Sequence, residues 1–119
     1  MAQGNILVQG WLWPGAIQLI AALADLQRGF GVQGGVGEIG VHHGRLFILL
    51  HLLSAPGERS AAWDLFEDQD QNIDASGRGD YARLLANLKT HGCDLGRIQI
   101  TKANSMELDH LIHLHLYVF

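Results

Sequence analysis

The sequence predicts an α/β fold, a three-layer sandwich in which a partial parallel sheet lies between helices. Short apolar stretches of strand character alternate with longer stretches of helical spacing, in the order β-α-β-α-β after an N-terminal helix. Strands separated by helices form parallel sheets with right-handed crossovers, so the expected strand order is 3-2-1. A chain of 119 residues has room for a single domain.

Composition narrows the class of protein. Hydrophobic residues make up 48% of the chain and charged residues 17%, which excludes global disorder. A net charge of −4 does not favour nucleic acid as a partner. Cys93 is the sole cysteine, so no intramolecular disulfide can form and a cytoplasmic location is expected. Residues 1–10 do not have the features of a secretory signal, and no apolar stretch is long enough to cross a membrane.

The first helix is expected at Gly15–Gln27. Pro14 suits its first turn, where the missing N–H costs nothing, and Gly29 and Gly31 stop it. Apolar residues recur at helical spacing between these limits. Trp11 and Trp13 precede the helix, and we expect both indoles to pack on a neighbouring layer.

The remaining elements are expected to alternate between strands and helices. They are a strand at Val36–Val41, a helix at Arg45–Leu53, a strand at Ala61–Phe66, a helix after Asp80 that ends at Gly92, and a strand at Arg97–Thr101. The second helix is apolar on nearly every side, which predicts burial on more than one face. The polar stretch Glu67–Gly79 reads as a long loop. Leu114–Phe119 is β-prone and could add a fourth strand.

A glycine-containing turn joins the first strand to its helix. Gly35-x-Gly37-x-x-Gly40 formally matches a dinucleotide fingerprint, but the expected strand lies inside the match. The register Glu38-x-Gly40-x-x-x-Gly44 instead places two glycines in the turn. There the backbone can approach a ligand, and the helix N-terminus offers free N–H groups. A nicotinamide-dinucleotide binder therefore remains the less favoured alternative.

The second strand ends in an acidic residue, Asp64. A carboxylate there can accept hydrogen bonds from both hydroxyls of a ribose, and Leu65 and Phe66 can flank an adenine. Ligands of parallel α/β sheets bind beyond the carboxyl ends of the strands. The expected site therefore also includes Asn104 and Ser105, which follow the third strand.

These motifs resemble class I S-adenosylmethionine-dependent methyltransferases, most closely the macrocin O-methyltransferase-like type. The stretch from Gly37 to Gly44 resembles the first motif of that family, and Trp63-Asp64-Leu65-Phe66 resembles its second strand with the acidic end. Ile98–Ser105 resembles the third strand and its loop. The resemblance covers Gly10–Leu108 and implies a Rossmann-like domain that is truncated relative to the family's full seven-stranded fold.

The resemblance implies S-adenosylmethionine as the cofactor and a small molecule with a hydroxyl as the methyl acceptor. Glu38, Gly40 and Gly44 would line the methionine and ribose end of S-adenosylmethionine, and Asp64 would bind the ribose hydroxyls. Phe66 would pack near adenine, whose edge Ser105 or Asn104 would reach. The predicted cofactor-binding residues are Glu38, Gly40, Val41, His42, Gly44, Asp64, Leu65, Phe66, Asn104 and Ser105.

The predicted organisation has a helical segment at 1–30, a cofactor-binding core at 31–108 and an atypical apolar tail at 109–119. The family's later strands, with their acidic segment near the methyl group, have no counterpart, so no catalytic residue is assigned. His110, His113 and His115 have no partner that completes a closed zinc site, so no metal is predicted. The alternative function is a non-catalytic interaction module or remnant, a homodimer formed through the sheet edge and the apolar tail.

Overall fold

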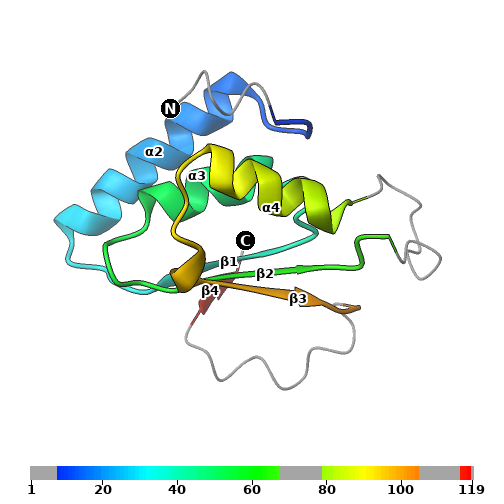
Figure 1. Cartoon of the computed structure of the whole chain (residues 1–119). Helices are drawn as coiled ribbons and strands as arrows, with labels where there is room; N and C mark the ends of the chain where they lie inside the picture. The colour runs from blue at the N-terminus through cyan, green and yellow to red at the C-terminus, as the bar shows by residue number, and fades with distance from the viewer. Residues whose placement is uncertain (1–7, 68–78, 105–115, 119) are drawn as a thin grey trace.

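The computed structural model describes residues 8–67, 79–104 and 116–118, and its elements follow the predicted order (Figure 1). They are α2 (Pro14–Gly29), β1 (Gly35–Ile39), α3 (Arg45–Leu53), β2 (Ser60–Asp64), α4 (Tyr81–Thr90), the 3-10 turn η2 (Leu95–Arg97), β3 (Ile98–Lys102) and β4 (Leu116–Val118). In Figure 1 the helices α2, α3 and α4 lie over the same face of the sheet. The described residues therefore form two of the three predicted layers.

The sheet is parallel, with strand order β3-β2-β1-β4. This confirms the predicted order 3-2-1 and adds β4 beside β1. In the register, Glu38 lies opposite Ala62, and Ala62 lies opposite Ile100. Because both crossovers step in the same direction and are right-handed, α3 and α4 must cover the same face. The carboxyl ends of β1, β2 and β3 consequently meet at one edge of the sheet.

The core lies between this helical layer and the sheet. On α3, the residues from Phe47 to His51 are all buried, as its apolar sequence predicts, because α3 contacts both β1 and α2. Leu84 and Leu88 of α4 are fully buried against the same cluster, together with Ala62 of β2. The core therefore fixes α3 and α4 on the sheet.

His51 is a polar member of this core, with only 1% of its surface exposed. Its Nε2 accepts a hydrogen bond from the backbone N–H of Asp94 (3.3 Å), so the proton is on Nδ1, which donates to Ser60 Oγ at 2.7 Å. Burial, and then the nearby Arg97 guanidinium, lower the pKa of His51. The neutral ring thus connects α3 to β2 and to the loop before β3.

The boundaries of the strands depart from the sequence prediction by one to two residues at each end. β1 ends at Ile39 because Gly40 has a left-handed backbone (φ 80°), and β2 ends at Asp64 shortly before Phe66, which is also left-handed (φ 51°). The prediction for the third helix is confirmed, since the Asp80 carboxylate accepts a hydrogen bond from the Arg83 N–H at 3.0 Å.

The expectation for the two tryptophans is wrong. Trp11 is 77% exposed and Trp13 is 81% exposed. The segment is held to α3 through its backbone instead, because the Arg45 guanidinium donates to the carbonyls of Val8 and Gly10 at 3.3 and 3.2 Å. No helix within the described ranges has the length and apolar character needed to span a membrane.

Candidate functional site

The turn between β1 and α3 depends on three left-handed residues, Gly40 (φ 80°), His42 (φ 56°) and Gly44 (φ 91°). The N–H of Gly40 donates to the Trp63 carbonyl at 2.8 Å, which ties the turn to β2. A Cβ on Gly44 would lie 2.5 Å from Leu84 Cδ1, so this glycine also allows α4 to pack closely. Space around a Cβ on Gly40 is open, as a site that admits a ligand requires.

The formal dinucleotide fingerprint does not form a turn. Gly35 and Gly37 lie within β1, and a Cβ on Gly37 would meet the Trp63 ring at 3.1 Å. Gly37 therefore allows β1 and β2 to pack closely. The structure confirms the register that places Gly40 and Gly44 in the turn.

Asp64 lies at the carboxyl end of β2 and binds two backbone N–H groups. Its Oδ2 accepts from His42 at 2.7 Å, and its Oδ1 accepts from Phe66 at 2.8 Å. A carboxylate has about four lone-pair positions, so two more donors can be accommodated. Two adjacent hydroxyl groups of a ligand could donate hydrogen bonds to these two positions. The same hydrogen bonds stabilise the left-handed backbone of His42 and Phe66.

Glu38, near the carboxyl end of β1, is only 8% exposed. Burial, and secondarily the Asp64 carboxylate, raise the pKa of Glu38 to about 8. Its Oε2 is buried and has no hydrogen-bond partner within the described part of the chain. Near neutral pH the Glu38 carboxyl is therefore mostly protonated and can donate a hydrogen bond.

The two histidines of the turn contribute chiefly through their backbone. The His42 N–H donates to Asp64, and the His43 carbonyl accepts from Asn87 Nδ2 at 2.9 Å. Their rings stack with centroids 3.8 Å apart, and the exposed Trp11 ring lies 5.3 Å from His42. These contacts favour a structural role for the pair over that of a catalytic base.

The ring of Phe66 does not form an open surface for adenine. It is 0% exposed and packs edge-on against Tyr81 with centroids 5.4 Å apart. Val41 is also in the core, at 3% exposed, whereas Leu65 is half-buried. The Phe66 ring therefore belongs to the core, and its expected position near adenine stays a prediction. Only the backbone of Phe66 remains at the strand end.

The loop after β3 also approaches the site. The Ala103 N–H donates to the Asp64 carbonyl at 3.0 Å, which places Asn104 next to the end of β2, while Ser105 lies outside the described residues. Sequence reasoning missed Gly79. A Cβ there would lie 3.1 Å from Asp64 Oδ1 and 3.3 Å from Phe66 Cα. The signal in the sequence was a glycine directly before the helix cap Asp80.

Other candidate chemistry is weak. The described ranges contain no group of three or more His, Cys, Asp or Glu residues that could hold a metal ion, and His110, His113 and His115 lie outside them. Cys93 is buried, and burial raises its thiol pKa to about 11. Cys93 is therefore a protonated core residue.

Comparison with known proteins supports the fold. No model of a known protein family matches the chain, and no characterised sequence matches it significantly. A proposed O-methyltransferase from Klebsiella pneumoniae superposes with a TM-score of 0.58 at 14% identity, over 89% of this chain and 42% of that protein. Cofactor-bound Rv0187 from MTB superposes with a TM-score of 0.64 at 14% identity, over 98% of this chain and 48% of that protein.

These likenesses concern the fold. The chain spans less than half the length of either protein. Its strands and helices form a Rossmann-like α/β unit that corresponds to part of the fold of those proteins. The macrocin-like specificity is not addressed by either similarity.

Proposed function

We propose that this chain binds S-adenosylmethionine at the carboxyl ends of β1 and β2, as the cofactor-binding part of a methyltransferase. The observation that carries the proposal is the meeting of Glu38 and Asp64 beside the left-handed turn from Gly40 to Gly44. The fold shared with a proposed O-methyltransferase supports it.

The residues fit the chemistry of this cofactor. The two remaining acceptor positions of Asp64 suit the two ribose hydroxyls, and the open space at Gly40 allows the ligand to lie against the backbone. Glu38 is buried with an unpartnered Oε2, and a cationic group of the cofactor would lower its pKa. Cofactor binding near pH 7 should therefore release a proton from Glu38.

When bound, S-adenosylmethionine supplies an electrophilic methyl group on its sulfonium. The contribution of the chain is to hold the ribose and to position the methionine end next to the turn, which accelerates an in-line transfer by orientation. We propose a small-molecule hydroxyl as the acceptor on the strength of the resemblance. The acceptor hydroxyl loses its proton in the transfer, and no residue of the chain is assigned to accept it.

Calorimetric titration with S-adenosylhomocysteine tests the proposal. The wild-type chain should bind saturably, and Asp64→Asn should weaken binding by about 10- to 100-fold, because hydrogen bonds to a charged group contribute about 1.5–3 kcal/mol. Asp25→Asn makes the same charge change at an exposed position of α2 and should bind like the wild type.

Circular dichroism must show that each variant is folded, since Asp64→Asn also removes one backbone hydrogen bond. Two results would contradict the proposal. One is the absence of binding by a folded wild-type chain, and the other is equal affinity in Asp64→Asn and Asp25→Asn.

A further inference from the structure

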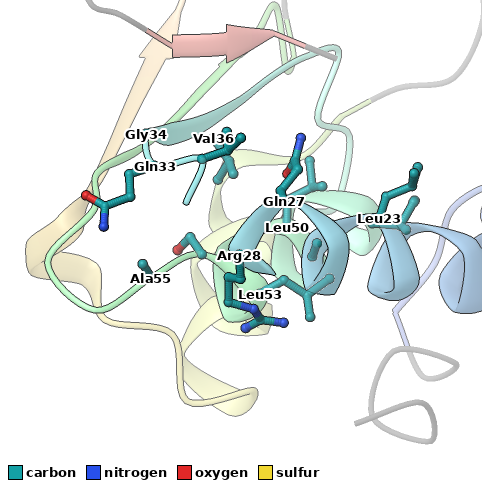
Figure 2. Close-up of a pocket in the computed structure, with 13 residues that line it drawn as sticks. Leu23, Gln27, Arg28, Gln33, Gly34, Val36, Leu50, Leu53 and Ala55 are labelled. Atoms are coloured by element: carbon teal, nitrogen blue, oxygen red, sulfur yellow. The ribbon is translucent and has the colours of Figure 1, made fainter. Parts of the chain in front are cut away.

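A pocket lies at the other end of β1, away from the predicted cofactor site (Figure 2). It lies between α2 and α3 and has a volume of about 160 Å³. Val36 lines it, whereas the glycine turn begins at Gly40, about 13 Å further along the strand at 3.3 Å per residue. Its apolar walls include Ile20, Leu23, Ala24, Val36, Leu50 and Leu53.

The pocket exists because α2 is loosely packed. None of its residues is buried, although Ile20 and Ala24 face α3 at helical spacing. By contrast, Leu50 on the opposite wall is 4% exposed. Leu23 on the α2 side is 48% exposed, so the pocket is open to solvent on that side. The small side chain of Ala24 leaves part of the space between α2 and α3 open.

The size and lining of the pocket define what it can hold. An enclosed cavity of about 150 Å³ lined by leucine, isoleucine and phenylalanine binds benzene, so a pocket of similar volume has room for one aromatic ring. The side chains of Gln27 and Gln33 stand at the rim in Figure 2, where an amide can form a hydrogen bond with one polar group. Arg28 also reaches the rim but is ion-paired with Asp25, which does not favour an anionic ligand.

We propose that this pocket binds a small uncharged aromatic molecule that carries one hydroxyl group, at a site separate from the cofactor site. The apolar walls would contact the ring on its buried side, and a rim amide would bind the hydroxyl. Phenol is the simplest probe with this chemistry. The proposal does not depend on the proposed methyltransferase function.

Phenol titration, followed by calorimetry and by backbone amide chemical shifts, tests this proposal. Ala24→Leu places three more carbon atoms in the pocket and should abolish binding. Ala22→Leu makes the same change at an exposed position of α2 that does not line the pocket, and it should bind phenol like the wild type. Because it fills empty space, Ala24→Leu should also raise the unfolding temperature by about 4 °C relative to Ala22→Leu.

In the wild type, the amide shifts should cluster at residues 20–36 and 50–55. The proposal is overturned if the wild type shows no saturable binding, if the shifts cluster elsewhere, or if a folded Ala24→Leu chain binds phenol as tightly as Ala22→Leu. If Ala24→Leu fails to fold, the chemical-shift changes of the wild type still show whether phenol binds in this pocket. Titration of Ala22→Leu with S-adenosylhomocysteine reports separately on the cofactor site.

Discussion

Replacing Gly44 with alanine should destabilise the fold through two separable effects. The left-handed backbone (φ 91°) costs about 1–2 kcal/mol for a residue with a Cβ. The new Cβ would also lie 2.5 Å from Leu84 Cδ1, and Leu84 is 0% exposed. Forcing an additional carbon into a packed core costs about 1–3 kcal/mol. The free energy of unfolding should therefore fall by about 2–5 kcal/mol.

Gly57→Ala is the matched control. Gly57 has nearly the same backbone (φ 87°) but nothing within 4 Å of a built Cβ, so this variant should lose only the backbone contribution of about 1–2 kcal/mol. Urea unfolding of both variants measures the difference. Leu84→Val removes the clashing methyl, and in that background Gly44→Ala should cost no more than Gly57→Ala. The reasoning is refuted if Gly44→Ala costs the same as Gly57→Ala, or if Leu84→Val does not reduce its cost.

Three further outcomes are expected. Because the pKa of Glu38 is raised to about 8, the folded chain retains a proton that the unfolded chain loses above pH 4.5, so stability should fall by about 3 kcal/mol between pH 4.5 and 7. Urea unfolding across this range should show that Glu38→Gln removes this part of the slope, and an unchanged slope would contradict the assignment. Because the pKa of His51 is lowered in the folded chain, the unfolded chain takes up a proton at a higher pH than the folded chain does. The contribution of His51 to the free energy of unfolding should therefore be complete above pH 6.5 and decline as the pH falls below it. His51→Gln should lack this decline in acid unfolding curves. Gly40→Ala should lose about as much stability as Gly57→Ala but, unlike that variant, should lose affinity for S-adenosylhomocysteine in calorimetry.

Local signals explain why the element order could be predicted from the sequence. The bounds of α3 at Arg45–Leu53 match the prediction because a left-handed glycine precedes the helix and a continuous apolar run fills it. Asp80 identified the start of α4 through its capping side chain. Strand ends were less accurate, because neither Gly40 nor Phe66 reveals its φ angle in the sequence alone.

The candidate site was predicted only in outline. The positions of Glu38, Asp64 and the turn follow from strand order, since parallel strands bring their carboxyl ends together. The burial of the Phe66 ring and the approach of Gly79 to Asp64 depend on how α4 and its preceding loop pack. Contacts between residues distant in sequence leave no periodic pattern. The role of Glu38, Asp64 and the turn in binding a cofactor remains a prediction.

The sequence by itself determined the α/β class, the strand order and the two carboxyl groups at the sheet edge, because hydrophobic periodicity and glycine placement are local properties of the chain. Only the tertiary structure decided that Glu38 is buried with a pKa near 8, that Trp11 and Trp13 are exposed, and that a pocket lies beneath α2. Burial, electrostatic environment and packing gaps arise from neighbours that the chain brings together from distant positions. These properties therefore exist only after the helices have packed on the sheet.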